Sequence, residues 1–362
     1  MTGTETRTGA GVLERWAERL PIDERTPPLT LHEGATPLVA SPRLAEWVGV
    51  RELHLKFEGM NPTGSFKDRG MVVAVAKALE AGAHTVLCAS TGNTAASAAA
   101  YAARAGIDAV VLLPAEKVAA GKMAQAIAHG ARVVALETNF DGALDLAREL
   151  ADRFAATLVN SVNPHRLEGQ ATAAYEVCET LGGPPDVLAL PVGNGGNITA
   201  YWLGFRRERD RRGDDRAPRM LGCQAAGAAP LVRGDPVARP ETVATAIRIG
   251  RPATWEPALE AASQSGGAIL AVDDDAILEA HREIARREGV FCEPASATGV
   301  AGLRAAVRDG AVDPASRCVC VLTGHGLKDP AAAVPRRFEP LRPDADADAI
   351  AAALGWEGRT AG

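Results

Sequence analysis

Aromatic residues are scarce in this sequence: tryptophan, tyrosine and phenylalanine together make up 4% of the 362 residues. Charged residues make up 23% and hydrophobic residues 47%, a globular composition, since disordered chains are richer in charge and poorer in apolar residues. No uninterrupted apolar run reaches the roughly 18 residues that a transmembrane helix needs. The first ten residues are polar, so no secretory signal peptide is expected.

Cysteine and an excess of positive charge are also lacking. Six cysteines are too few for a disulfide framework, and none of them forms a C-x-x-C pair. The seven histidines are scattered without ligand spacing, so we expect no metal site. The net charge of −6 argues against general binding to nucleic acid or to an anionic membrane. We therefore expect a protein of the reducing cytoplasm, without a nucleic-acid or membrane partner.

Short apolar runs alternate with helical patterns along the chain. Buried apolar strands separated by helices are typical of βαβ units, so we predict an α/β fold with parallel sheets covered by helices on both faces. The length allows two domains, or one large domain with an embedded lobe. Strands are predicted at residues 83–89, 109–113, 131–136, 157–159, 187–192 and 317–322, and helices at 95–105, 119–129, 140–154, 168–181 and 198–212.

Polar, glycine-rich segments follow three of the predicted strands. They are residues 90–94 (STGNT), 193–197 (GNGGN) and 323–326 (TGHG). In open parallel sheets, ligands bind beyond the carboxyl ends of the strands. We therefore expect these three segments to carry the chemistry.

The segment 193–197 suits one phosphate group. A glycine-rich turn between a strand and a helix exposes consecutive backbone N–H groups at the helix N-terminus, where an anion is stabilised. Ile198 stands where a dinucleotide fingerprint has its third glycine, and no lysine follows as in a P-loop. A plain tight turn is the alternative, but three glycines with two asparagines at this place favour a monophosphate.

Lys67 lies in the segment NPTGSFKDRG, in which Asn-Pro and Thr-Gly mark a loop. Ser65 is predicted to cap a helix that starts near Phe66. The helix dipole disfavours a cation in the first turn, so Lys67 is either a solvated charge or a functional amine with a lowered pKa. The monophosphate segment favours the second interpretation, because pyridoxal phosphate needs one amine and one phosphate cradle.

Seven segments, in order from about residue 30 to residue 330, carry a family resemblance. They are NPTGSFKDRG, STGNTAASAAAYAARAG, NSVNPHRLEGQ, PVGNGGNITAYW, PETVATAIRIG, EPASATGVAGL and LTGHGLKDP. The chain resembles the threonine synthases, which are pyridoxal-phosphate enzymes of the tryptophan-synthase β-like fold (fold type II). The resemblance implies two α/β domains with the active site in the cleft between them, and a homodimer. The larger, cofactor-binding domain would comprise residues 1–70 and 160–362, and the smaller one residues 71–159.

The resemblance also implies which residues bind the cofactor, pyridoxal 5′-phosphate. Lys67 is similar to the lysine that binds the cofactor covalently and then moves protons. Asn93 would donate a hydrogen bond to the 3′-oxygen, and Thr323 would contact the pyridine nitrogen. A neutral hydroxyl there does not hold the nitrogen protonated as a carboxylate would. The cofactor phosphate would lie in the cradle formed by Gly193, Asn194, Gly195, Gly196 and Asn197.

A second group of residues is implied for the substrate. Ser90, Thr91 and Thr94 would hold the substrate carboxylate, and Thr94 is counted with Lys67 among the catalytic residues. The phosphate of the substrate itself would be held by Asn160, Ser161 and Arg166, since an arginine with two polar neighbours makes a good clamp for a divalent anion. The alternative for Arg166 is a surface ion pair with Glu168.

The reaction implied by the resemblance is the conversion of O-phospho-L-homoserine and water into L-threonine and phosphate, by γ-elimination and β-addition. The leaving group is a phosphate, which explains why one chain has two phosphate sites. A serine/threonine dehydratase is one alternative, although it needs no second anion clamp. A non-catalytic regulator that binds the cofactor or a metabolite is another, although it needs neither Lys67 nor Thr323.

Overall fold

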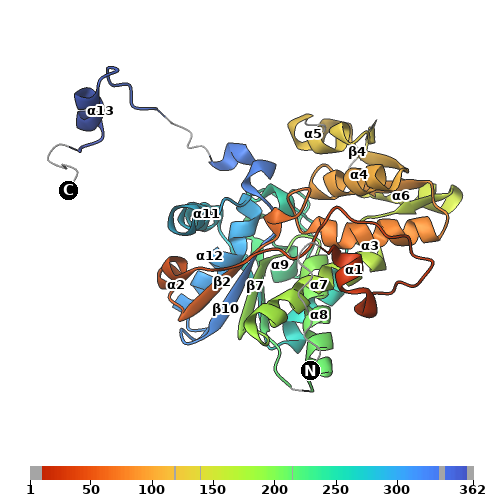
Figure 1. Ribbon diagram of the computed structural model, residues 1–362, viewed down its shortest axis with the longest axis horizontal. Coiled ribbons are helices and arrows are strands. Elements are labelled where there is room, and N and C mark those ends of the chain that lie inside the picture. The colour runs from red at the N-terminus through yellow and green to blue at the C-terminus, as the bar shows by residue number, and fades with distance from the viewer. Residues whose placement is uncertain (1–9, 118–119, 139, 214, 334–338, 357–362) are drawn as a thin grey trace.

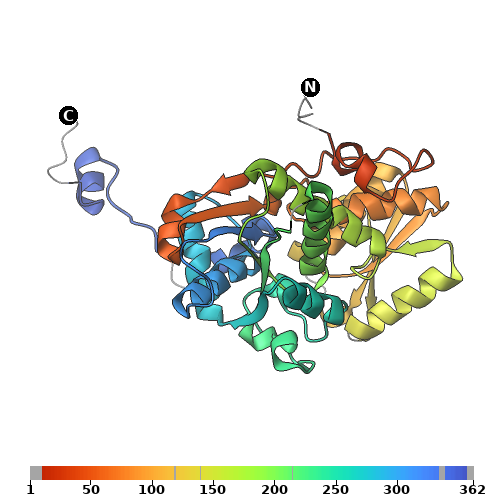
Figure 2. The ribbon, with the colours of Figure 1, turned by 90° about the horizontal axis from the view of Figure 1, so that it is seen from below.

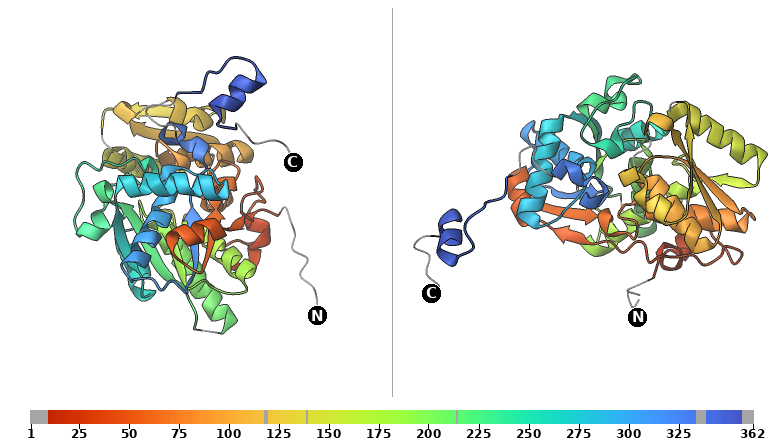
Figure 3. Two further views of the ribbon diagram at one scale, coloured as in Figure 1. Left: turned by 90° about the vertical axis from the view of Figure 1, so that its left-hand side faces the viewer. Right: turned by 90° about the horizontal axis from the view of Figure 1, so that it is seen from above.

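The computed structural model describes residues 10–117, 120–138, 140–213, 215–333 and 339–356. Within these ranges the chain forms two β-sheets with helices on both faces of each. Figure 1 shows the smaller sheet with α4, α5 and α6 at the upper right and the larger sheet, with β2, β7 and β10, below and to the left. Figure 2 and Figure 3 show α13 standing away from the rest of the chain.

The larger sheet has six strands in the order β1-β2-β10-β7-β8-β9, and only the β1–β2 pair is antiparallel. Side chains that alternate along β10 separate its two faces: Cys318 and Cys320 pack with α11 and α12, whereas Val319 and Val321 pack with α7 and α8. The strand bounds are β1 Leu38–Ala40, β2 Glu52–Phe57, β7 Val187–Pro191, β8 Arg219–Ala225, β9 Ala268–Val272 and β10 Arg317–Leu322.

The smaller sheet has four parallel strands in the order β5-β4-β3-β6. Val86 and Cys88 of β3 face α4, and Leu87 between them faces α6, so each face has its own helical cover. The strand bounds are β3 Thr85–Ala89, β4 Asp108–Pro114, β5 Arg132–Leu136 and β6 Ala156–Leu158.

The helices confirm the predicted alternation of strands and helices. Their bounds are α1 Val12–Arg15, α2 Pro42–Val48, α3 Lys67–Glu80, α4 Asn93–Ala105, α5 Ala120–Ala128, α6 Phe140–Arg153, α7 Pro164–Leu181, α8 Gly196–Arg212, α9 Pro230–Arg233, α10 Trp255–Gln264, α11 Asp274–Glu288, α12 Pro294–Arg308 and α13 Ala347–Ala353. The predicted boundary between residues 70 and 71 falls inside α3, and the domain boundaries stay a prediction. Residue 119, the predicted start of α5, lies outside the described residues.

Two local predictions are wrong. The helix predicted from residue 168 begins four residues earlier as α7, because the side chain of Asn163 accepts a hydrogen bond from the backbone N–H of His165 and Pro164 occupies the first turn. Ser65 does not cap α3: the N-cap residue is Phe66, and the Ser65 hydroxyl is buried without a hydrogen-bond partner among the residues that the structure describes. The start of α3 is therefore fixed by other contacts.

A buried ion network holds the start of α3. The guanidinium of Arg69 donates to both carboxylate oxygens of Glu58, at 2.7 and 2.9 Å, and to both of Glu176, at 2.7 Å each. Lys56 Nζ donates to Glu176 Oε2 at 2.6 Å. Burial alone would raise the pKa of Glu176, but Arg69 and Lys56 outweigh it and hold this pKa well below its usual range. The network thus consists of two buried cations and two buried carboxylates, and their hydrogen bonds join β2, α3 and α7.

We predict that Glu176→Gln lowers the free energy of unfolding by about 3–5 kcal/mol, because it leaves Lys56 and Arg69 with one carboxylate between them. The measurement is urea denaturation of the cofactor-loaded protein. The matched control is Glu149→Gln, which removes an exposed pair with Arg153 and should cost less than about 1 kcal/mol. Equal losses in the two variants would show that the network is not a main source of stability.

Candidate active site

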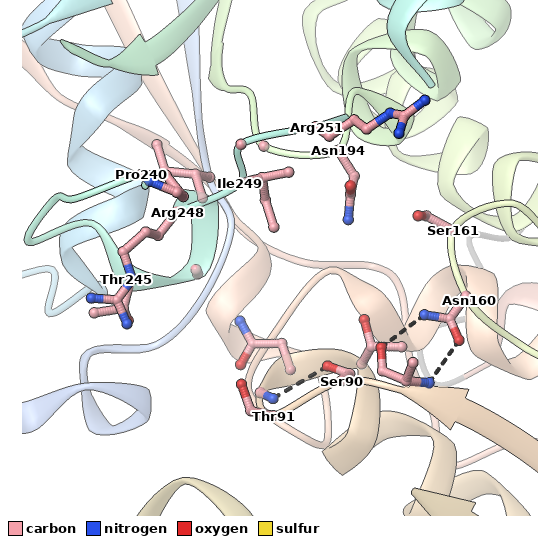
Figure 4. A pocket seen from close by; sticks show the side chains of 18 of the residues that line it. Ser90, Thr91, Asn160, Ser161, Asn194, Pro240, Thr245, Arg248, Ile249 and Arg251 are labelled. Atoms are coloured by element: carbon pink, nitrogen blue, oxygen red, sulfur yellow. Dashed lines mark hydrogen bonds between the residues drawn. The ribbon is translucent and has the colours of Figure 1, made fainter. Parts of the chain in front are cut away.

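A cleft of about 1020 Å³ lies at the carboxyl ends of both sheets. The three segments predicted from the sequence all contribute to its wall, because each follows a strand: 90–94 follows β3, 193–197 follows β7 and Thr323 follows β10. In Figure 4, Asn160 and Ser161 lie on one side of the cleft, and Thr245 and Arg248 lie on the other. The three predicted segments therefore meet at one cleft between the two sheets, and the site itself stays a prediction.

Lys67 is the first residue of α3 and lines the cleft. Burial, and after it the nearby guanidinium of Arg166, lowers the pKa of Lys67 to about 7, while the carboxyl group of Glu293 opposes the shift. Among the described residues Lys67 Nζ has no hydrogen-bond partner, and it lies 4.4 Å from the ring centroid of Phe66. Near neutral pH a large fraction of this amine is therefore uncharged and able to act as a nucleophile or a base.

The loop before Lys67 is fixed by the next residue, Asp68, which the sequence did not single out. Its buried carboxylate accepts hydrogen bonds from the backbone N–H of Thr63 at 2.7 Å, from the Thr63 hydroxyl at 2.6 Å and from the Ser97 hydroxyl at 2.6 Å. Burial raises the pKa of Asp68 to about 6. The backbone N–H of Phe66 donates to Thr323 O at 3.0 Å, so the lysine loop and the segment after β10 form one unit.

The segment 193–197 has the shape of an anion cradle. Gly195 has a φ of +85°, and a Cβ there would lie 2.5 Å from Thr254 O, so no other residue fits without a shift of the backbone. Its neighbour Gly196 begins α8, and residues 193–198 line the cleft, so the backbone N–H groups that a helix leaves free in its first turn lie beside the cleft. Asn197 Nδ2 is buried and has no hydrogen-bond partner in the described part of the chain. An orphaned donor beside a helix N-terminus fits the phosphate of pyridoxal phosphate.

The two residues predicted to contact the cofactor ring come from opposite sides of the cleft. Asn93 is the first residue of α4, which covers the smaller sheet, and Thr323 directly follows β10 of the larger sheet. Both line the cleft, and Thr323 is 5% exposed. With Lys67 and the cradle, they offer an amine, an amide and a hydroxyl around one cavity, a donor set that fits pyridoxal phosphate.

The residues predicted for the substrate carboxylate lie at the N-terminus of α4. Ser90, Thr91 and Thr94 all line the cleft, and the Ser90 hydroxyl accepts a hydrogen bond from the backbone N–H of Gly92 at 3.2 Å. Figure 4 shows Ser90 and Thr91 together below the opening. A helix N-terminus with hydroxyl groups is a suitable site for a carboxylate.

The residues predicted for the substrate phosphate are arranged differently from expectation. Asn160 and Ser161 line the cleft, but the Asn160 amide is already paired with the backbone of Ala89, at 2.9 Å in both directions. Arg166 is fully buried behind the wall and is not among the lining residues. Its Nη1 donates to Val159 O at 2.8 Å, whereas Nε and Nη2 have no partner in the described chain. Burial lowers the pKa of Arg166 to about 10.

The alternative for Arg166, an ion pair with Glu168, is wrong. Glu168 pairs instead with Arg207 of α8, at 2.6 Å and 3.0 Å. Arg166 is therefore a buried cation without a carboxylate partner among the described residues, next to the amine of Lys67.

Sequence reasoning missed other polar groups of the wall. Glu293 and Lys328 line the cleft, as do Arg248 and Arg251 of the segment after β8. Lys328 Nζ donates to Thr63 O at 3.1 Å and to the side chain of Gln125 on α5, which links the two layers. The matching segments EPASATGVAGL and LTGHGLKDP contain Glu293 and Lys328, and this was the one signal that could have pointed to them.

Known proteins share both the sequence and the fold of this chain. A family model described as pyridoxal-phosphate dependent enzyme matches residues 29–324. The threonine synthase of Mycobacterium leprae (strain TN) is 55% identical over 359 residues, which cover 98% of this chain and 99% of that protein. The threonine synthase of Synechocystis sp. (strain ATCC 27184 / PCC 6803 / Kazusa) is 52% identical over 350 residues, covering 96% and 91%. Among solved structures, maize serine racemase has a TM-score of 0.71 at 21% identity, covering 87% and 91%.

The fold and the site together define a class of enzyme that uses pyridoxal phosphate in a cleft between two α/β layers. The chain belongs to the family of pyridoxal-phosphate dependent enzymes and has the fold-type II architecture. The fold class and the cofactor expected from the sequence are thereby confirmed.

The lowered pKa of Lys67 predicts the pH dependence of covalent cofactor attachment. Only the uncharged amine attacks an aldehyde, so the rate of attachment to the cofactor-free protein should rise with pH and level off above about 7. The measurement is the growth of the visible absorption band after pyridoxal phosphate is added. Lys67→Ala should fold but show no such band. A rate that climbs on toward pH 10, or a covalent band in Lys67→Ala, would contradict the assignment.

Proposed function

We propose that this protein is a threonine synthase, a pyridoxal-phosphate dependent lyase that converts O-phospho-L-homoserine and water into L-threonine and phosphate. Curated relatives with this name match almost the whole chain at more than half identity, which supports the proposal. The geometric observation that carries it is the second cationic site. Arg166 lies behind the wall formed by Asn160 and Ser161, apart from the cradle at residues 193–197.

Each group of residues would have its own task. Bound pyridoxal phosphate supplies the electron sink that makes the Cα and Cβ protons of the substrate acidic. Lys67 Nζ holds the cofactor between turnovers and takes the Cα proton when the substrate amine has replaced it. The N-terminus of α4, with Ser90, Thr91 and Thr94, holds the carboxylate and thereby orients Cα toward Lys67.

The phosphate of the substrate would leave toward Arg166. Arg166 Nε and Nη2 have no partner in the described chain, so they would donate charge-assisted hydrogen bonds to a dianion once a shift of the wall at Asn160 and Ser161 exposes them to the cleft. Ser161 lies close to the cradle as well as to the proposed second anion site. A Cβ added to Gly196, at the start of α8, would lie 3.8 Å from the Cβ of Ser161. The second proton on the Asn160 amide nitrogen is available to the same phosphate, because its first proton goes to Ala89 O.

Product identification tests this function. The holoenzyme should release one phosphate and one threonine for each molecule of O-phosphohomoserine consumed. It should release little ammonia from serine or threonine, which separates it from a dehydratase. Rapid ammonia release with no phosphate release would support the dehydratase, and no turnover of either substrate would support the regulator.

The assembly and the location of the protein are part of the same proposal. We infer a homodimer in the cytoplasm. In the part of the chain that the structure describes, no helix is both long and apolar enough to cross a membrane. The six cysteines are free and buried, which agrees with a reducing compartment.

We predict that Arg166→Ala raises the KM for O-phosphohomoserine about tenfold or more, because two charge-assisted bonds to the substrate phosphate are lost. The kcat should fall as well, since the same phosphate must be stabilised as it departs. Cofactor content and absorption spectrum should stay near those of the wild type, because the cradle at 193–197 binds the cofactor phosphate independently. Steady-state kinetics and a cofactor titration measure both effects.

Two variants control this prediction. Arg166→Lys keeps the charge without the planar fork and should restore the KM only in part. Arg207→Ala removes an arginine that pairs with Glu168 outside the cleft wall, and should leave the KM unchanged. Loss of cofactor from Arg166→Ala with an unchanged KM would contradict the assignment of two separate phosphate sites.

A further inference from the structure

Glu293 places a buried carboxyl group in the wall of the cleft, and none of the tasks described above uses it. The residue is 3% exposed and directly precedes α12. The backbone N–H of Glu293 donates to Gly324 O at 3.0 Å, and the neighbouring residues Cys292 and His325 form an isolated antiparallel β-bridge. The absence of a side chain at Gly324 leaves space for the side chain of Glu293, since a Cβ added to Gly324 would lie 2.6 Å from the carboxyl carbon of Glu293. Backbone pairing and packing therefore fix this carboxyl group in place.

The carboxyl group contacts both residues that are assigned to the cofactor ring. Asn93 Nδ2 donates to Glu293 Oε2 at 3.2 Å and, more weakly, to Oε1 at 3.4 Å. Thr323 Oγ1 lies 3.3 Å from Glu293 Oε1. Asn93 belongs to the smaller layer and Thr323 to the larger one, so Glu293 bridges the cleft between them.

The bridge determines what the Thr323 hydroxyl offers to its surroundings. This hydroxyl has one proton and two lone pairs, and its other neighbour is the Ser296 hydroxyl at 3.1 Å. An ionised Glu293 can only accept hydrogen bonds, so the Thr323 hydroxyl donates its hydrogen to Glu293 and can offer other partners only its oxygen as an acceptor. A protonated Glu293 donates instead, which frees the Thr323 proton for another partner.

The surroundings of Glu293 raise its pKa above the ordinary value of a glutamate, and burial is the main cause. Burial raises the pKa of Glu293, and Asp329 acts in the same direction. The hydrogen bonds from Asn93 and Thr323 and the ammonium of Lys328 oppose the rise without cancelling it. Lys67 also lies within electrostatic range of this carboxyl group.

We propose that Glu293 is a positioning residue for the cofactor: its carboxyl group holds the Asn93 amide and the Thr323 hydroxyl in the orientations in which they contact the two sides of the pyridine ring. The inference rests on the assignment of Asn93 and Thr323 to the cofactor. It does not depend on which amino acid the enzyme makes. It gives Glu293 a role in cofactor binding and in the electronic state of the ring, and no direct contact with the substrate.

Cofactor titrations of three variants test the proposal without substrate. Glu293→Gln keeps the length of the side chain and mimics the neutral acid, with one acceptor and one donor. It should keep the dissociation constant for pyridoxal phosphate within about threefold and the absorption maximum near that of the wild type. Glu293→Ala leaves the Asn93 amide and the Thr323 hydroxyl without this partner. It should weaken binding about tenfold or more and shift the absorption maximum. Glu293→Asp is one methylene too short to span both partners and should resemble Glu293→Ala.

The matched control is Glu33→Ala. Glu33 is also a fully buried carboxylate, which accepts from the backbone N–H of Val12 at 2.9 Å and from the Tyr101 hydroxyl at 2.8 Å, but it does not line the cleft. This variant should lose thermal stability and keep the cofactor affinity and spectrum of the wild type.

Three outcomes would overturn the proposal. In the first, Glu293→Ala keeps the wild-type affinity and absorption maximum. In the second, Glu293→Ala and Glu33→Ala change affinity and spectrum alike, which would reduce Glu293 to a structural role. The third applies if Glu293→Ala does not fold, so that the other two variants decide. The proposal is then overturned if Glu293→Asp binds the cofactor with wild-type affinity, or if Glu293→Gln no longer binds the cofactor. Because no substrate is present, none of these outcomes depends on whether threonine is the product.

Discussion

The pairing of Arg69 with Glu58 and Glu176 is the constraint on which the rest of the site depends. These three charges are buried, so each must find its partner at a fixed distance or cost several kcal/mol. Arg69 lies two residues after Lys67, and its partners belong to the segment after β2 and to α7. The network therefore fixes the start of α3 relative to the large sheet and thereby holds Lys67 in the wall of the cleft.

The electrostatics of the cleft follow from this arrangement. Burial and the guanidinium of Arg166 lower the pKa of Lys67 to about 7, so the chain prepares a neutral amine at a position where an ordinary lysine would be charged. The same buried arginine lacks an anionic partner among the described residues, and a substrate phosphate would supply one. In the proposed function, this one cation lowers the pKa of the amine and would bind the leaving phosphate, while the glycine cradle would bind the cofactor phosphate separately.

Much of the fold could be predicted from the sequence, because apolar strands and helical patterns alternate over residues 83–212 and three of the predicted strands are followed by a polar, glycine-rich segment. The residues at those strand ends, such as Asn93 and Thr323, line the cleft as expected. The contacts of Asp68 and Glu293 could not be predicted, because each depends on partners far away in the sequence, at Ser97 and at Asn93. Arg166 shows the same limit: its type and motif suggest an anion clamp, but only packing reveals that it lies behind the wall.

The most direct test of the account is to run the reaction in water enriched in ¹⁸O and to analyse both products. Elimination breaks the bond between carbon and the phosphate oxygen, and the new hydroxyl group comes from water. The account therefore predicts threonine with ¹⁸O in its β-hydroxyl group and phosphate that left without any ¹⁸O. Label in the phosphate, with homoserine as the other product, would mean simple hydrolysis at phosphorus and would contradict it.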